Sequence, residues 1–209
     1  MSLSPEYFRD VYAAHEDPFM LDSKWYERRK YALTLASLPK PQYRRGLEPG
    51  CSIGVLTEQL AARCEHLVST DVVQSALDTA RSRVGESAAV DFALWSLSDD
   101  VSALPNPHEK FDLIVVSEVG YYLDAEDLAA AMSRIVGRLE AGGTLVAAHW
   151  RHDVDDYPIS GDRVHEIIAA TTGLAALSRY LDEDVRIEVF IATDVPAVSV
   201  ASTDGLDVR

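Results

Sequence analysis

The stretch GLEPGCSIGVLTEQLAARC, residues 46–64, decides the fold because it places a glycine-containing turn between a short strand and an amphipathic helix. Gly50 and Gly54 carry no side chain, so the backbone of this turn can come close to a ligand. The helix that follows offers free N–H groups to a carboxylate or a phosphate. The turn also spells G-x-S-x-G around Ser52, the motif of a serine hydrolase nucleophile. Two alternatives follow: a ligand-cradling loop or a nucleophile.

Outward from this turn, short apolar runs alternate with amphipathic helices, which is typical of a parallel sheet with helical crossovers. Five strands are expected at 43–48, 66–70, 89–94, 111–117 and 144–150. The fourth, FDLIVVS, is almost continuously apolar, as in a central strand covered on both faces. The pattern therefore predicts a doubly wound α/β sheet.

Four helices are expected between and after these strands. The first carries Leu56, Leu60 and Cys64 on one face. The second has an apolar stripe at helical spacing, made of Val73, Ala76, Leu77, Ala80 and Val84. The third begins at the N-cap Asp124 and directs inward Leu128, Met132, Ile135, Val136 and Leu139. The fourth spans about 161–172 and ends at Gly173.

The two ends of the chain depart from this alternation. Ser4-Pro5-Glu6 predicts the start of a first helix, and a second is expected from about 23 to 38. Near the other end, the acidic residues 182–184 form a connection so short that the last two strands must pair antiparallel. We expect one domain over 1–194, made of a helical lid (1–40) and a seven-stranded α/β core (43–194), and then a tail (195–209).

Composition narrows the possible partners of the 209-residue chain. Lys plus Arg number 19 against 34 Asp plus Glu, and the formal charge of −15 weighs against nucleic acid. No apolar run approaches the roughly 20 residues of a membrane span, and the start lacks signal-peptide features, so we expect a cytoplasmic protein without a membrane partner. Two cysteines, Cys51 and Cys64, are too few for a disulfide framework and are expected to be free thiols.

One local group of basic residues departs from the acidic balance. It consists of Lys24, Arg28, Arg29, Lys30, Arg44 and Arg45. Such a group is either a solvated helix face or a surface that meets an anion, and the sequence leaves both open.

The rest of the chain decides between the two interpretations of the turn. An α/β-hydrolase needs several strands and an oxyanion-hole segment before its nucleophile, whereas the residues before Gly50 are mostly helical. Asp71 instead closes the next strand, where a carboxylate can accept hydrogen bonds from both hydroxyls of a ribose. Because Ser52 interrupts the G-x-G-x-x-G spacing, a nicotinamide or flavin enzyme is disfavoured.

Four motifs in order resemble the class I S-adenosyl-L-methionine (SAM) dependent methyltransferases: EPGCSIG (48–54), Asp71, FDLIVVSEVGYYL (111–123) and GGTLVAAHWRH (142–152). Within this class, LEPGCSIGVLT, SEVGYYL, HWRH and DPF…WYERRKYALTLASLP are most similar to the nodulation protein S type of N-methyltransferase, which acts on an amino sugar of a chitin-like oligosaccharide. The likeness covers about residues 16–193. It implies a Rossmann-like sheet, SAM as cofactor with S-adenosyl-L-homocysteine (SAH) as product, and a small-molecule acceptor.

The resemblance also implies which residues hold the cofactor. The methionine part would be lined by Glu48, Gly50, Ser52 and Gly54. Asp71 would bind the ribose, Ser96 and Leu97 would flank the adenine, and Val72 would pack against it. Trp25 and Tyr26 could close over the cofactor, where an aromatic ring gains a cation–π contribution from the sulfonium. The class often has an acid near the position of Ser96, which this chain lacks.

Candidate catalytic residues follow the fourth and fifth strands, because ligands collect at the carboxyl ends of such strands. Glu118 is expected to hold the cofactor or the acceptor amine, and Tyr121 and Tyr122 to contact substrate. Proton acceptors or positioning residues are expected at His149 and His152.

Arg151 and His165 are further candidates for substrate binding. No metal is expected, because H-x-x-H around residues 149–152 lacks further ligands at a recognised spacing. The sequence leaves open a small-molecule O-methyltransferase, a SAM-binding module without activity, and a hydrolase using Ser52.

Overall fold

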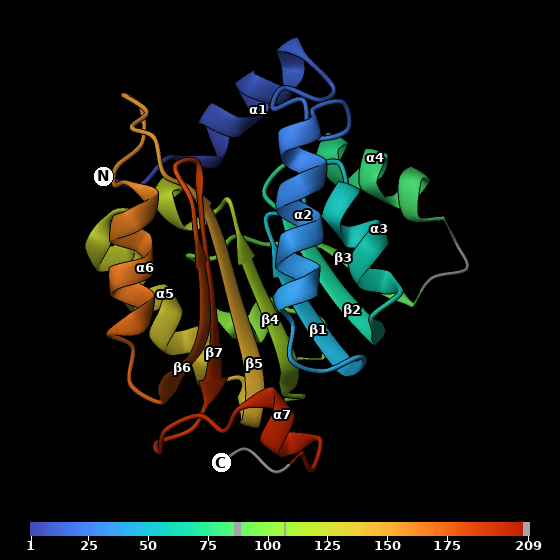
Figure 1. Ribbon diagram of the computed structural model, residues 1–209. Helices are drawn as coiled ribbons and strands as arrows, with labels where there is room; N and C mark the ends of the chain where they lie inside the picture. The colour runs from blue at the N-terminus through green and yellow to red at the C-terminus, as the bar shows by residue number, and fades with distance from the viewer. Residues whose placement is uncertain (86–88, 107, 207–209) are drawn as a thin grey trace.

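The computed structural model describes residues 1–85, 89–106 and 108–206. These residues form one seven-stranded sheet with the order β3-β2-β1-β4-β5-β7-β6 (Figure 1). The strands are β1 (Tyr43–Pro49), β2 (Cys64–Asp71), β3 (Val90–Leu94), β4 (Phe111–Ser117), β5 (Leu139–Trp150), β6 (Leu174–Leu181) and β7 (Val185–Ala192). Strands β1 to β5 run parallel, and β7 pairs antiparallel with β5 and β6. The predicted sheet and its C-terminal hairpin are therefore confirmed.

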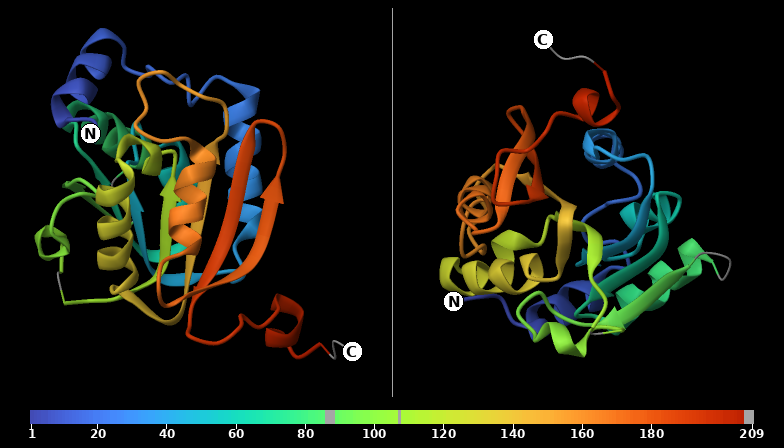
Figure 2. Two further views of the ribbon diagram at one scale, coloured as in Figure 1. Left: turned by 90° about the vertical axis from the view of Figure 1, so that its left-hand side faces the viewer. Right: turned by 90° about the horizontal axis from the view of Figure 1, so that it is seen from below.

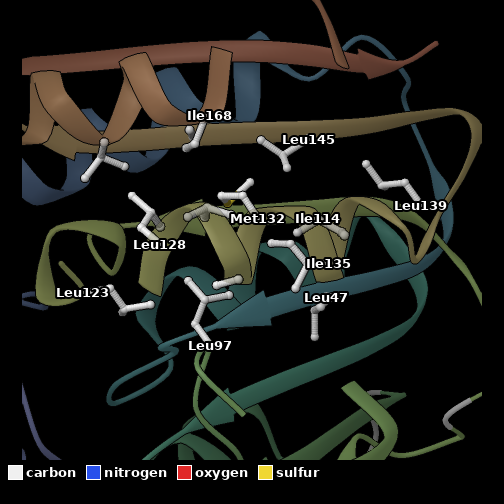
Figure 3. Close-up of a cluster of buried hydrophobic side chains, with 14 of the residues drawn as sticks. Leu47, Leu97, Ile114, Leu123, Leu128, Met132, Ile135, Leu139, Leu145 and Ile168 are labelled. Atoms are coloured by element: carbon white, nitrogen blue, oxygen red, sulfur yellow. The ribbon is translucent and has the colours of Figure 1, made fainter. Parts of the chain in front are cut away.

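Strand β4 is apolar from Leu113 to Val116 because its two faces enter two separate cores. Successive side chains of a strand point to opposite faces. Ile114 and Val116 belong to one core, whereas Leu113 and Val115 belong to the other. Figure 3 shows the first core, where Ile114 lies among side chains from helices and from neighbouring strands.

Helices cover both faces of the sheet. On one face lie α5 (Ala125–Val136) and α6 (Gly161–Ala169), and α2 (Trp25–Ser37) and α3 (Val55–Ala61) pack into the core of the other face (Figure 2, left). Helix α4 (Gln74–Val84) packs beside α3 and buries Ala76, Leu77 and Ala80. Asp124 caps α5 by accepting a hydrogen bond from Asp127 N, as predicted.

Two residues that the sequence placed on helices begin strands instead. Cys64 is the first residue of β2 and pairs with Tyr43, because α3 ends at Ala61 and the chain turns at once. Leu139 starts β5 and pairs with Phe111. Both remain buried, so the apolar periodicity found the core residues but ran past the helix ends.

The N-terminal helices stand where a lid is expected. Helix α1 (Pro5–Ala14), capped by Ser4, crosses the end of the sheet opposite to α7 (Figure 1). Leu3 N donates to Tyr122 O at 2.8 Å, which straps this segment to the loop after β4. After Val195 the chain forms one helical turn, α7 (Val200–Thr203), and then continues to 206; residues 207–209 of the expected tail lie outside the described residues. Within the described part of the chain, no helix has the length and apolarity needed to span a membrane.

Candidate active site

The carboxyl ends of β1 to β5 open into a cavity of about 820 Å³, a size that suits a small-molecule ligand. The sheet order places its lining residues in a row. Ser96 follows β3, Asp71 ends β2, Gly50 follows β1, Glu118 follows β4 and Trp150 ends β5. Neighbouring strands are about 4.8 Å apart, so this row of five residues crosses the edge in four even steps. Helices α1 and α2 contribute the remaining wall.

The turn after β1 has an unusual backbone. Gly50, Ser52 and Gly54 all have positive φ, at 72°, 51° and 81°. A Cβ on Gly54 would lie 2.8 Å from Ala80 Cβ, so glycine lets α3 and α4 pack closely. Gly50 and Ser52 line the cavity, whereas Gly54 does not. Gly54 thus shapes the turn behind the cavity, and its predicted contact with the cofactor stays a prediction.

Ser52 does not have the surroundings of a nucleophile. Its Oγ accepts a hydrogen bond of 2.5 Å from Tyr12 Oη on α1. An activated serine needs a base within hydrogen-bond reach. Burial raises the pKa of the Tyr12 hydroxyl, which makes it no base at neutral pH. The surroundings of Ser52 therefore do not support the hydrolase alternative. The hydrogen bond from Tyr12 instead links the lid helix α1 to the turn after β1.

Asp71 closes β2 and is 7% exposed. Its Oδ2 accepts from Ser52 N at 2.9 Å and its Oδ1 from Val73 N at 3.0 Å. Burial raises the pKa of this carboxyl, and the backbone N–H donors oppose that shift. Each carboxylate oxygen can accept more than one hydrogen bond, so both retain capacity toward a ligand in the cavity.

Glu48 lies in β1 beneath the turn and is 2% exposed. Its Oε2 accepts from Thr57 Oγ1 at 2.7 Å and from Ser69 Oγ at 2.8 Å. Burial outweighs these hydrogen bonds and raises the pKa of Glu48 to about 7. A carboxyl in this state exchanges its proton near neutral pH.

The raised pKa of Glu48 predicts a pH-dependent stability. Between its ordinary value of 4.5 and about 7, the folded protein keeps a proton that the unfolded chain has lost. Stability therefore falls as pH rises through this window, by about 3 kcal/mol at 1.36 kcal/mol per pKa unit. Glu48→Gln should remove that loss and melt higher than the parent protein at pH 8, but not at pH 4.5. Equal melting differences at both pH values would contradict this assignment.

Glu118 follows β4 with a positive φ of 55°, which is costly for a residue with a side chain. Its Oε2 accepts hydrogen bonds from Tyr121 Oη and, at 3.2 Å, from Trp150 N. Its Oε1 lies 2.9 Å from Lys30 Nζ. The strained backbone thus places a carboxylate on the cavity wall between β4 and β5, at the strand end where the sequence places Glu118.

Lys30 and Glu27 complete this wall, and the sequence interpretation missed both. Lys30 is 2% exposed, and its Nζ lies 2.7 Å from Glu27 Oε2 on the same helix. The sequence grouped Lys30 with surface basic residues, but several of that group pair with acids: Arg29 with Asp182, Arg44 with Glu140, and Arg45 with Glu109. The spacing of Glu27, Lys30, Tyr31 and Thr34, all buried, marks the inward face of α2.

Aromatic side chains form the next part of the wall. Tyr121 is buried and stacks on Tyr157, with ring centroids 4.6 Å apart. Tyr122 Oη lies 3.4 Å from Tyr157 Oη, and its ring meets Phe8 of α1 edge to face at 4.8 Å. Both predicted tyrosines therefore line the cavity, joined by Phe8 and Tyr157, which the sequence did not indicate.

The structure places His149, a predicted catalytic candidate, behind the cavity wall. It is fully buried and does not line the cavity, because its side chain leaves β5 on the face covered by α6. Gly120 N donates to its Nε2 at 3.2 Å, so the proton lies on Nδ1 and is donated to His165 Nε2 at 3.2 Å. His165 Nδ1 then donates to Glu188 at 2.8 Å. Burial lowers the pKa of both histidines, so both rings are neutral. Their hydrogen bonds hold the backbone of Gly120 in place.

Three further predicted residues also lie away from the cavity lining. His165 belongs to the buried chain just described, His152 pairs with Asp184 at 2.8 Å, and Arg151 binds Asp162. Their predicted roles in catalysis and substrate binding are therefore not supported by their positions. In the described residues, no group of three or more His, Cys, Asp or Glu is placed to hold a metal ion.

At the other end of the row, the expected adenine residues meet the cavity. Val72, Ser96 and Leu97 all line it. Asp99 lines it as well, and its Oδ2 accepts from Ser96 N at 2.8 Å. The sequence has no acidic residue at position 96, but the structure brings the carboxylate of Asp99, three residues later, to this part of the cavity.

The lid residues Trp25 and Tyr26 line the cavity in different ways. Trp25 is 70% exposed at the rim. Tyr26 meets Trp150 edge to face at 5.0 Å, and its ring lies 5.2 Å from Lys30 Nζ. Tyr26 therefore belongs to the wall near Glu118 rather than to the turn after β1.

An acid at the end of β2 also occurs in dinucleotide-binding sheets, but those have no antiparallel strand between the fifth and the last. Here β7 occupies that place. The fold is that of the class I SAM-dependent methyltransferases.

The particular family follows from comparison with known proteins. A model of the family Nodulation protein S (NodS) matches residues 8–158, and the chain belongs to this family. Nodulation protein S of Rhizobium tropici is 35% identical over 178 residues, which cover 84% of this chain and 70% of that protein. That of Bradyrhizobium diazoefficiens is 35% identical over 143 residues, which cover 68% and 66%.

A solved structure agrees with this membership. The N-methyltransferase NodS from Bradyrhizobium japonicum WM9, in complex with SAH, superposes with a TM-score of 0.77 at 28% sequence identity. The match covers 90% of this chain and 97% of that one. Most of this chain and nearly all of that one therefore share one fold.

Proposed function

We propose that this protein transfers the methyl group of SAM to the nitrogen of an amino sugar or a similar small amine. The methyltransferase activity follows from the family and its fold. The amine acceptor is supported by one observation above all. The same cavity holds the turn of Gly50 with Asp71 at one end and the carboxylates of Glu118 and Glu27 at the other.

The residues present fit the cofactor. Asp71 retains hydrogen-bonding capacity for the ribose, and the positive φ of Gly50, without a Cβ, leaves room for the methionine part beside Glu48 and Ser52. Val72 and Leu97 would enclose the adenine, with Asp99 as the acid nearest its amino group. When bound, SAM supplies a methyl group on a positively charged sulfur, which is its leaving group.

The chain's own residues orient the acceptor and exclude water, which is the main contribution of a protein to such an in-line displacement. The acceptor nitrogen forms its bond to the methyl carbon as the carbon–sulfur bond breaks, and one N–H proton must leave. Glu118, fixed by Tyr121 and Trp150 N, can receive that proton or hold the nitrogen in line. Helices α1 and α2 roof the cavity, so their closure would keep water out.

The acceptor is identified by a panel of related sugars. The protein and SAM would be incubated with a chitin disaccharide that has one free amine, and with its fully N-acetylated counterpart, and the products analysed by mass spectrometry. We expect SAH and an N-methyl sugar from the first sugar only. Methyl transfer to a hydroxyl would favour the O-methyltransferase, and SAH binding without any turnover would favour a non-catalytic module.

We propose separately that the protein is located in the cytoplasm. Cys51 and Cys64 are buried and unpaired. Free thiols fit the reducing cytoplasm that the sequence predicts.

A further inference from the structure

Three ionisable side chains meet at the acceptor end of the cavity. The side chains of Glu27, Lys30 and Glu118 are 10%, 2% and 17% exposed. Lys30 Nζ lies between the two acids, 2.7 Å from Glu27 Oε2 and 2.9 Å from Glu118 Oε1. Two carboxylates around one ammonium leave one excess negative charge. Of the described residues that line the cavity, the other lysine is Lys24, which is exposed.

The polar atoms of this cluster retain hydrogen-bonding capacity toward the cavity. Glu27 Oε2 and Glu118 Oε1 each face Lys30 Nζ, and a carboxylate oxygen can accept more than one hydrogen bond. Among the described residues, Tyr26 Oη beside them is buried without a hydrogen-bond partner. Buried polar atoms are nearly always hydrogen-bonded, so this hydroxyl next to two carboxylates with spare acceptor capacity indicates a polar ligand at this wall.

We propose that Glu27 and Glu118 form a cation site for the ammonium group of the acceptor, with Lys30 as a built-in counter-charge. This inference rests on the proposed function, because it requires an amine as the acceptor. An ammonium group carries a positive charge and N–H donors, which match the excess negative charge, the spare acceptor capacity of the two carboxylates and the unpartnered Tyr26 Oη. A neutral amide, such as an N-acetyl group, matches neither.

Lys30 has a definite task in this site. Two carboxylates so close in a buried place repel each other, and one would take up a proton. Lys30 keeps both available, and the rings of Tyr26 and Tyr31 hold its Nζ at 5.2 and 5.3 Å from their centroids. Since Lys30 and Glu27 come from α2 and Glu118 follows β4, the cation site is complete only when the lid helix lies against the sheet.

The bound ammonium must lose a proton before its nitrogen can attack. Glu27 faces Lys30 and Tyr31 on its own helix and Glu118 across the cavity. Burial raises the pKa of Glu27 even though Lys30 opposes the shift. A proton passing from the ammonium to the Glu27 carboxylate leaves a neutral amine and a neutral acid, and the nitrogen lone pair becomes free for methyl transfer.

The charge count gives a sharp test. Glu27→Gln brings the cluster to zero net charge, and Glu27→Gln/Lys30→Met restores one negative charge. Binding of the free-amine chitin disaccharide and of its N-acetylated counterpart would be titrated in the presence of SAH. We expect Glu27→Gln to weaken amine binding at least about tenfold and the double variant to recover most of it. Binding of the N-acetylated sugar should stay unchanged in both.

Several outcomes would overturn the cation site. One is an unchanged amine affinity in Glu27→Gln, another is an equal loss for both sugars, and a third is a double variant no better than the single one. Glu16→Gln makes the same charge change on an exposed part of the lid and should leave amine affinity at the parent value. SAH affinity and melting temperature report folding in each variant. If the parent protein methylates no amine, the proposed function fails; if it does while Glu27→Gln keeps its affinity, only the cation site fails.

Discussion

Glu118→Gln is expected to lower kcat/KM at least about 100-fold, because positive charge moves from sulfur to the acceptor nitrogen during methyl transfer and a carboxylate beside that nitrogen stabilises it. The amide can still accept from Trp150 N, and Lys30 keeps Glu27 as its partner. The folded structure should therefore survive. Steady-state kinetics with SAM and the amine acceptor would measure the loss.

The control for this variant makes the same change on the surface. Glu126 is exposed on α5, and Glu126→Gln should retain the parent kcat/KM. SAH titration and thermal melts of Glu118→Gln separate loss of chemistry from loss of cofactor or fold. A kcat/KM within about threefold of the parent value would remove Glu118 from the reaction, since a group that acts in proton transfer contributes roughly 100-fold or more.

Asp71→Ala is expected to weaken SAH binding roughly 10- to 100-fold, because hydrogen bonds to a charged group contribute about 1.5–3 kcal/mol. The variant also removes the acceptor for Ser52 N, which helps to hold the turn in its left-handed conformation. At 100 times the parent Kd, bound ligand stabilises a protein by about 2.7 kcal/mol, and this should fall to between about 1.4 and about 0.4 kcal/mol in the variant. Thermal melts with and without SAH would measure it.

Asp78→Ala provides the matched control, because Asp78 is exposed on the helix that follows the same strand. Its melting shift with SAH should equal that of the parent protein. An equally large shift in Asp71→Ala would mean that the ribose does not bind at the end of β2. The rest of the row across the sheet edge would then need a different assignment.

The sheet could be predicted from the sequence because its physical cause is local. Continuous apolar runs such as 111–117 need cover on both faces, and a connection of a few residues before β7 enforces an antiparallel pair. Helix ends were predicted less well. Cys64 and Leu139 continue the apolar periodicity of a helix, yet each begins a strand, since a strand entering the core needs an apolar residue too.

The site was predictable where one segment provides it, and less so where distant segments meet. The turn around Gly50, with Asp71 and Glu118 at strand ends, follows from the position of each in its own motif. The burial of His149 could not be predicted, because the cover of its strand face by α6 depends on tertiary packing. The sequence left Lys30 between a solvated face and an anion-binding surface, because its second acid, Glu118, comes from the end of a remote strand. Helix α2 carries Glu27 and Lys30 on its inner side because these side chains meet Glu118 in the cavity wall.

A crystal structure with SAH is the most direct test of the central claim that the loops of β3, β2, β1 and β4 bind the cofactor in that order. We predict adenine beside Leu97, ribose hydroxyls within hydrogen-bonding distance of Asp71, and the sulfur directed toward Glu118. SAH bound outside this cavity, or bound within it with the adenine against Glu118, would contradict the account.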